Sequence, residues 1–162
     1  MSDVAFIGGS TVDRALDPAN GLEDQLRIFP QFLVNYVGFN VTKVPFDDPL
    51  VRRAFVMGLD RERLNEVVFD GKVDTAKGLL PPGLPGYNEA LEGLPYDPTA
   101  AKAALEASQY AGDAFPEVVF TTAGFGGVPA DLQFMIDEWQ RNLGVTVSVR
   151  TLDPDAYYYA LA

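Results

Sequence analysis

The segment EVVFTTAGFGGVPADLQFMIDEWQRNLGVTVSV, residues 117–149, contains the signals that decide the fold. Residues 117–122 are rich in β-branched side chains, which favours a strand. Residues 129–142 repeat apolar side chains at helical spacing and are followed by Gly144, a typical helix stop. Residues 145–149 alternate valine with polar residues, as a half-buried strand does. The segment therefore predicts a βαβ unit with parallel strands and a right-handed crossing helix.

The predicted helix has one apolar face. Its apolar residues stand at positions i, i+3, i+4, i+7 and i+11, so they share one side of the helix. We interpret this stripe as core packing and not as a ligand site. The expected core residues of the helix are Leu132, Met135, Ile136, Trp139 and Leu143.

Three aspartates mark further helix starts upstream of this segment. Asp48 and Asp97 are each followed by proline, so an acidic cap precedes the residue preferred at the first helical position. Asp60 can cap another helix, which Asp70 and Gly71 would end. The sequence therefore predicts a helix after each of these aspartates.

Two more strands are predicted near the N-terminus. Val4 to Ile7 is a short apolar run, and Phe32 to Asn40 is rich in aromatic and β-branched residues. The segment LLPPGLPGY, residues 79–87, is predicted to be an irregular, extended crossing that packs against the core, because its prolines and glycines disfavour regular structure. Together these elements predict an α/β fold, a mixed sheet with flanking helices.

Charged residues gather between Arg52 and Arg63, which raises the possibility of an anion site. A solvated, partly paired helix surface is the favoured interpretation, because charges spaced by three or four residues pair on exposed helix faces. The adjacent Asp47 and Asp48 are interpreted as helix capping and not as a pair of catalytic carboxylates.

The composition excludes several functions. The 162 residues suit one domain, and acidic residues outnumber basic ones by 23 to 12, giving a formal charge of −11. This charge disfavours nucleic acid and anionic membranes as partners. The absence of cysteine and histidine removes disulfides, thiolate metal sites and histidine-based catalysis. No apolar run reaches the length of a membrane span, so we expect no direct membrane insertion.

The glycine-rich segment between the predicted strand and helix is the candidate site. A dinucleotide-binding loop that contains Gly124 and Gly126 would need glycine where Pro129 stands, although Asp153 loosely fits the acid that holds the ribose. A Walker-type loop is excluded, because no Gly-Lys-Ser/Thr occurs. A tight strand-to-helix connection is one remaining interpretation. Ligand contact is another, because ligands of open α/β sheets lie beyond the carboxyl ends of the strands.

A series of motifs resembles the family 5 extracellular solute-binding proteins, the oligopeptide-, dipeptide- and nickel-binding components of ABC importers. Residues 45–54, PFDDPLVRRA, followed by Leu59-Asp60-Arg61, are similar to the family pattern P-F-x-D-x-x-V-R-x-A and A-x-D-R. Residues 78–83, GLLPPG, resemble the family's proline-rich crossing. Tyr96-Asp97-Pro98 resembles the start of its Y-D-P helix, and Leu143-Gly144-Val145 resembles its L-G-I/V strand entry.

The resemblance implies one lobe of a periplasmic-binding-protein type II-like fold, which closes on its ligand by hinge motion. It implies that residues 1–162 form a single domain, a truncated C-terminal ligand-binding lobe of a two-lobed protein. The implied function is capture of a solute, expected to be an oligopeptide, for import through a membrane permease. The implied protein is not an enzyme, no cofactor is expected, and no metal-binding residue is expected in this lobe, with an oligosaccharide or a nickel complex as alternative solutes. It is extracytoplasmic, in the periplasm or at the cell surface, with a lipid anchor expected on the full-length protein.

The resemblance also places the glycine loop at the cleft between the lobes. The expected ligand-binding residues are Thr122, Phe125, Gly126, Gly127 and Val128, and no residue is expected to be catalytic. The alternative is a small α/β nucleotide-binding or enzymatic domain that uses the loop from Gly124 to Gly127. That alternative predicts that a nucleotide stabilises the chain.

Overall fold

The computed structural model describes residues 10–27, 32–112, 115–124 and 126–161. The chain divides into two compact units, residues 1–33 and residues 34–162. In the first unit, helix α1 (Ser10–Leu16) is followed by two short 3-10 helices, η1 (Pro18–Asn20) and η2 (Glu23–Gln25). The strand predicted at Val4 to Ile7 lies outside the described residues. The expectation of a single domain over residues 1–162 stays a prediction.

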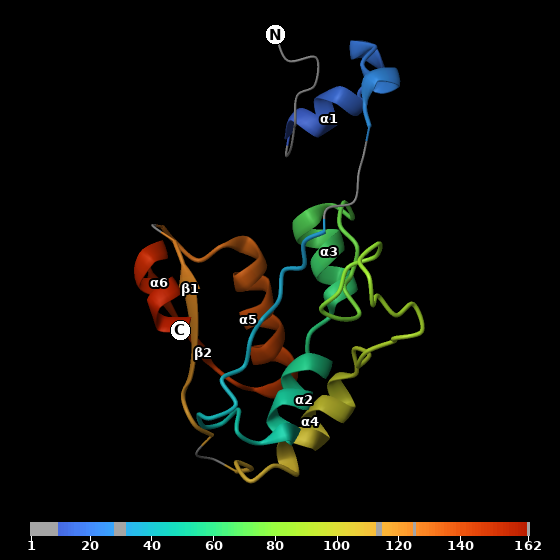
Figure 1. Cartoon of the computed structure of the whole chain (residues 1–162). Helices are drawn as coiled ribbons and strands as arrows, with labels where there is room; N and C mark the ends of the chain where they lie inside the picture. Colours follow the sequence, from blue (N-terminus) through green and yellow to red (C-terminus); the bar gives the residue numbers. More distant parts are fainter. Residues whose placement is uncertain (1–9, 28–31, 113–114, 125, 162) are drawn as a thin grey trace. The chain divides into compact units, whose positions relative to one another are not determined.

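The second unit contains the predicted βαβ segment (Figure 1). Strand β1 (Val118–Ala123) pairs in parallel with β2 (Val147–Leu152), from Val118 opposite Val147 to Ala123 opposite Leu152. Helix α5 (Ala130–Leu143) connects the two strands, and Gly144 ends it in the left-handed conformation. The expected α/β class and the parallel pairing are both confirmed, and the described sheet has these two strands.

The described residues of the second unit contain four further helices. They are α2 (Pro49–Met57), α3 (Arg61–Phe69), α4 (Pro98–Glu106) and α6 (Pro154–Leu161). Helices α5 and α6 lie on opposite sides of the two strands, while α4 packs against α2 and α5, and α3 packs against α5 (Figure 1). The sheet is therefore flanked by helices, as the sequence predicts.

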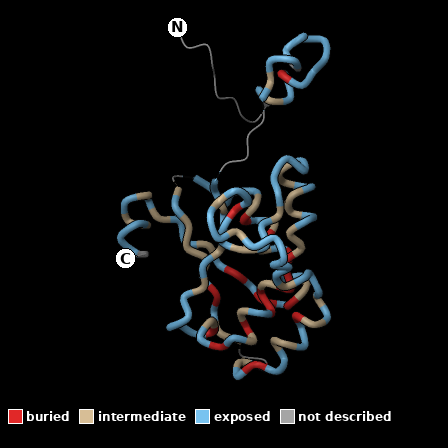
Figure 2. The backbone as a smooth tube through the Cα atoms, turned by 45° about the vertical axis from the view of Figure 1, so that its right-hand side comes forward, coloured by how far each residue is buried: buried red, intermediate tan, exposed pale blue. Residues whose placement is uncertain are grey.

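The core of this unit forms where α2, α4, α5 and the strands meet, and buried positions are concentrated there in Figure 2. Trp139 and Phe55 are 2% and 1% exposed, and their rings lie 5.2 Å apart. Burial of each such large apolar side chain stabilises the fold by about 1.5–3 kcal/mol. The predicted stripe of α5 is confirmed as core packing, with four members buried and Ile136 half-buried against them.

Aspartate caps set the starts of the helices. The side chains of Asp48, Asp60 and Asp97 accept hydrogen bonds from the backbone N–H groups of Leu50, Arg63 and Ala100 at 2.8, 3.0 and 2.9 Å. Each cap satisfies a first-turn donor that the helix itself leaves unpaired. The three helices predicted after these aspartates are confirmed.

The segment from Phe32 to Asn40 is not a strand, contrary to the prediction from its composition. Its burial still alternates, because Val37 and Phe39 are half-buried against the core while Tyr36 and Gly38 are exposed. A strand needs a neighbouring strand for its ladder, and within the described residues no backbone hydrogen bond joins residues 34–39 to another segment. The segment therefore alternates in burial as a strand does, but it is not paired with another strand within the described residues.

Two other expectations need correction. The charged surface around Arg63 is not a purely solvent-exposed one, because Arg63 pairs with Glu138, whose side chain is completely buried in α5.

The proline-rich crossing of residues 79–87 is irregular as predicted, but less of it packs against the core than expected. Pro81 is buried, whereas Leu79 and Leu80 are 72% and 45% exposed.

Candidate functional site

The glycine-rich loop begins at the carboxyl edge of the sheet. The parallel register places the last residues of the two strands, Ala123 and Leu152, beside each other at the same edge. The backbone N–H of Gly124 donates to the carbonyl oxygen of Leu152 at 2.9 Å, which extends the pairing one residue past β1. The start of the loop is therefore held in place by the neighbouring strand.

Gly126 and Gly127 in this loop are exposed, and the fold gives no reason for glycine at either position. A Cβ atom added at Gly126 or Gly127 would meet no described atom within 4 Å, and neither residue has a positive φ of the kind that favours glycine. By contrast, a Cβ at Gly124 would lie 3.7 Å from the Thr151 side chain. The missing side chains at 126 and 127 leave the backbone open to close approach from solvent.

The other predicted site residues flank these glycines. Thr122 is half-buried near the end of β1, opposite Thr151. Among the described residues, its hydroxyl makes only a long contact of 3.5 Å to the Ala123 carbonyl oxygen. Val128 is 41% exposed, just before α5. Phe125 lies outside the described residues. Their contact with a ligand stays a prediction.

The chemistry available at this loop is binding. Residues 122–128 contain no ionisable side chain, so they can offer backbone groups, a threonine hydroxyl and apolar surface, but no general acid or base. Pro129 precedes α5 and provides no side-chain cap, in contrast to the aspartates at the other helix starts. These properties suit hydrogen bonding to the main chain of a ligand.

Sequence reasoning missed the element beside this loop. Helix α6 begins directly after β2, and the side chain of Asp153 accepts a hydrogen bond from the backbone N–H of Ala156 at 3.0 Å. Asp153-Pro154 repeats the aspartate–proline signal of Asp48-Pro49 and Asp97-Pro98. That signal was sufficient to find α6.

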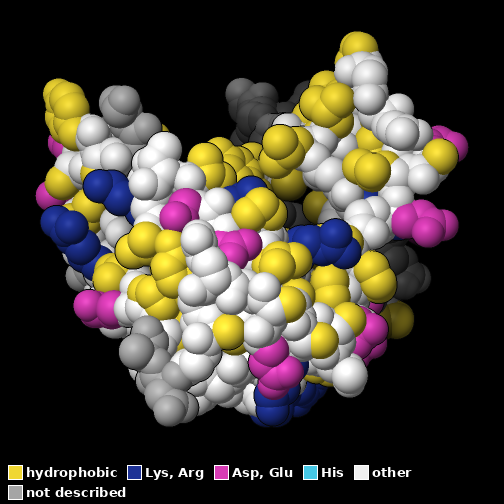
Figure 3. Space-filling view, turned by 90° about the horizontal axis from the view of Figure 1, so that it is seen from below, with side chains coloured by type: hydrophobic (Ala, Val, Ile, Leu, Met, Phe, Trp, Pro, Cys, Tyr) yellow, Lys and Arg dark blue, Asp and Glu magenta, His cyan; other side chains and the backbone are white. Residues whose placement is uncertain are grey.

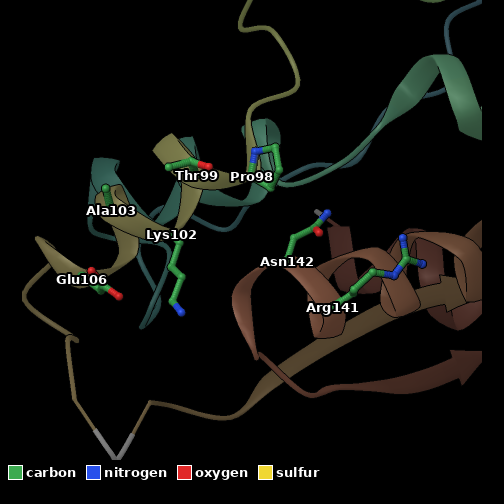
Figure 4. Close-up of a pocket in the computed structure, with 7 residues that line it drawn as sticks. All are labelled: Pro98, Thr99, Lys102, Ala103, Glu106, Arg141 and Asn142. Carbon is green, nitrogen blue, oxygen red and sulfur yellow. The ribbon is translucent and has the colours of Figure 1, made fainter.

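A hollow lies between α4 and the C-terminal end of α5 (Figure 4). It is an open groove of about 500 Å³ whose charged lining residues are Lys102, Glu106 and Arg141. In Figure 4 the ends of Lys102 and Arg141 point in different directions and do not converge on a common point. Binding pockets place a few polar groups convergently around a ligand, so we assign no ligand to this groove.

Another hollow, of about 250 Å³, lies near the start of α3. Asp60, Arg61 and Thr75 are among its lining residues. Two of these polar side chains already have roles within the fold, because Asp60 caps α3 and Arg61 donates to the Leu94 carbonyl oxygen at 2.6 Å. The hydroxyl of Thr75 is buried, and the described residues provide no hydrogen-bond partner for it.

The remaining surface features concern charge, metal binding and membrane crossing. On the face in Figure 3, Lys and Arg side chains lie in separate groups among acidic and apolar ones and form no continuous basic surface. Within residues 10–27, 32–112, 115–124 and 126–161, no cluster of acidic side chains could hold a metal ion. No helix in that part of the chain has the length and apolar character needed to cross a membrane.

Solved structures share this arrangement of strands and helices. The periplasmic binding protein DppA from Helicobacter pylori, in complex with the peptide STSA, aligns with a TM-score of 0.65 and 22% identity over 91% of this chain and 31% of its own. A dipeptide-binding protein from Pseudoalteromonas sp. SM9913, in complex with Met-Leu, aligns with a TM-score of 0.63 and 22% identity over 76% of this chain and 25% of its own. The fold is therefore that of the type II periplasmic binding proteins, of which this chain is a partial lobe.

The chain belongs to the bacterial extracellular solute-binding proteins of family 5, whose "Middle" model matches residues 2–162. It is 33% identical over 122 residues to di/tripeptide-binding protein 2 of Pseudomonas aeruginosa, covering 75% of this chain and 23% of that protein. It is 30% identical over 124 residues to the glutathione-binding protein GsiB of Salmonella typhimurium, covering 76% and 24%. The chain spans about a quarter of the length of these relatives.

Proposed function

We propose that this chain is part of the ligand-binding lobe of an ABC-importer substrate-binding protein, and that its glycine loop contacts a bound peptide. The observation that carries the proposal is the pair Gly126 and Gly127, which are exposed at the carboxyl edge of a parallel sheet and required there by neither packing nor backbone conformation. Glycine lets a ligand's main chain approach the loop backbone closely. Thr122 and Val128 would flank that contact.

A peptide is the ligand class that the relatives favour. One relative is named for di- and tripeptides and another for glutathione, which is itself a tripeptide. The absence of ionisable groups from residues 122–128 fits contact with a peptide main chain, because amide groups need hydrogen-bond partners and not countercharges. Charged ends of the ligand would then be held by other parts of the protein.

Family membership supports a role in transport. The family is extracellular, so we propose that the complete protein works outside the cytoplasm, presents its solute to a membrane permease and catalyses no reaction. A lipid anchor on the full-length protein is part of the same proposal. The comparisons give no support to the alternative of a nucleotide-binding or enzymatic domain.

Calorimetric titration of the complete gene product with a panel of di- and tripeptides tests this function. We expect saturable binding of at least one peptide class, and no stabilisation by ATP or NAD in a thermal-shift assay. The absence of binding to every peptide in the panel would contradict the proposal. Stabilisation by a nucleotide would favour the enzymatic alternative.

A further inference from the structure

The first turn of α5 carries a carboxylate close to the glycine loop in sequence. Asp131 is the second residue of α5 and follows Gly127 by four residues. The end of β1 and the start of α5 lie at the same end of the second unit (Figure 1). Residues 122–128 contain no ionisable side chain, so Asp131, which is half-buried, is the first ionisable residue after the loop.

The Asp131 carboxylate has no hydrogen-bond or ion-pair partner in the described part of the chain. The other acidic side chains of α5 are both paired. Glu138 is buried and pairs with two arginines. Asp137 is exposed and accepts a hydrogen bond from Gln133 at 2.8 Å. Asp131 therefore differs from its neighbours on the same helix in being half-buried without a partner.

The electrostatics of this position favour a positively charged partner. The helix dipole favours an acid in the first turn, which is sufficient reason for an exposed aspartate there. Partial burial takes the carboxylate away from water, however, and this costs free energy unless a cation pairs with it. The formal charge of −11 on the chain adds a long-range attraction for cations. A cationic group of the ligand is therefore a suitable partner for Asp131.

We propose that Asp131 selects peptides with a basic side chain, by pairing with the ammonium or guanidinium group of that side chain. The proposal rests on the proposed function, in which the main chain of the peptide lies against Gly126 and Gly127. A group that reaches Asp131 from there has to extend away from the main chain, as the long stems of lysine and arginine do. The loop then provides contacts common to all peptides, and Asp131 determines which of them bind most tightly.

Calorimetric titration of the complete gene product with matched tripeptides tests this selection. The probes are alanine tripeptides with lysine at the first, second or third position. Each is compared with its norleucine counterpart, which has a similar length but no charge. We expect at least one lysine peptide to bind ~10-fold more tightly than its counterpart. Asp131→Asn should remove this preference. Asp137→Asn is the matched control, because it removes one exposed charge from the same helix, and it should keep the preference.

Three results would overturn the proposal: a preference that persists in Asp131→Asn, a preference lost equally in both variants, or peptide binding by the parent protein without any preference for lysine. Binding of no peptide at all would instead refute the proposed function, and the selection with it. N-acetylated peptides separate the side chain from the terminal ammonium. If acetylation, and not norleucine, removes the affinity that depends on Asp131, the residue binds the peptide's N-terminus and the proposal is wrong.

Two further measurements separate selection from a structural role. If a cation elsewhere in the polypeptide pairs with Asp131, then Asp131→Asn should lower the melting temperature of the unliganded complete gene product clearly more than Asp137→Asn does. We expect no such difference, and its observation would contradict the proposal. Asp131→Lys reverses the charge and should bind alanine tripeptides that contain glutamate more tightly than those that contain lysine. An order of affinities that stays as in the parent protein would overturn the proposal.

Discussion

The indole N–H of Trp139 donates a hydrogen bond to the backbone carbonyl oxygen of Phe55 at 2.9 Å, and both side chains are almost completely buried. Phe55 lies in the last turn of α2, where helix carbonyl groups have no partner within the helix. The neighbouring Met57 carbonyl oxygen accepts from the N–H of Asp97 at 2.9 Å, and that of Gly58 accepts from Asn142 at 2.8 Å. The end of α2 is therefore closed by groups from α5 and from the start of α4.

Replacing Trp139 should reveal the contribution of this contact. Trp139→Phe keeps an aromatic ring but leaves the Phe55 carbonyl oxygen buried without its donor, which costs about 1–3 kcal/mol. Trp139→Ala also removes the ring and should cost about 3–5 kcal/mol. Urea unfolding followed by circular dichroism measures both, because Trp139 is the only tryptophan and its fluorescence is lost in the variants. Equal stability of Trp139→Phe and the parent protein would show that the hydrogen bond contributes nothing.

Glu138 and its arginine partners should behave cooperatively. The Glu138 side chain is fully buried, whereas Arg63 and Arg141, which both pair with it, are 50% and 52% exposed. Removing one arginine leaves the other, so Arg63→Ala and Arg141→Ala should each cost at most about 1 kcal/mol. Removing both leaves a buried carboxylate without a cation, which should cost about 3 kcal/mol or more.

A double-mutant cycle with a rescue measures this cooperativity. The loss in the free energy of unfolding of the double arginine variant should exceed the sum of the losses in the two single variants. Adding Glu138→Gln to the double variant should restore part of the loss, because the buried group is then neutral. Simple additivity of the two arginine variants would contradict this account of the ion pair.

Tyr110 should titrate at unusually high pH. Its hydroxyl donates to both carboxylate oxygens of Asp47, at 2.7 and 2.8 Å, and this hydrogen bond, with burial and the charges of Asp47 and Asp48, raises the pKa of Tyr110 to about 12. Because the pKa of Tyr110 is higher in the folded than in the unfolded state, Tyr110 contributes to the free energy of unfolding. This contribution is full below pH ~10 and is lost as the pH rises toward 12. The difference in tyrosinate absorbance between the parent protein and Tyr110→Phe measures this pKa. Asp47→Asn should lower it toward 10, the ordinary value.

Local signals made much of this fold predictable. Asp48, Asp60 and Asp97 act through atoms two or three residues away, so sequence spacing is sufficient to place the helices that they cap. The same signal at Asp153 precedes α6, which the sequence analysis did not predict. The signal for α6 was therefore present in the sequence.

Features that depend on distant partners were not predictable from local pattern. The composition of residues 32–40 favours a strand, but pairing requires a second segment, and none is present among the described residues. Glu138 lies on the polar side of the predicted helix, but it is buried in the fold and accepts a hydrogen bond from Arg63, 75 residues earlier. The strand–helix–strand order was sufficient to locate the glycine loop, whereas the proposed contact of this loop with a ligand depends on atoms outside the chain.

Substitutions in the loop should separate binding from stability. Because a Cβ at Gly126 or Gly127 meets no described atom within 4 Å, Gly126→Val and Gly127→Val should change the free energy of unfolding by less than about 0.5 kcal/mol. If a peptide main chain approaches this backbone, the same variants should weaken peptide binding at least ~10-fold, the loss of about 1.4 kcal/mol. Thr146→Ile is the matched control, since it adds bulk at an exposed residue just before β2, at the opposite edge of the sheet. Calorimetric titration of the complete gene product should show that the control variant binds peptide with unchanged affinity. Unchanged affinity in both glycine variants would show that the loop does not contact the ligand. The assignment of the chain to its family would not be affected.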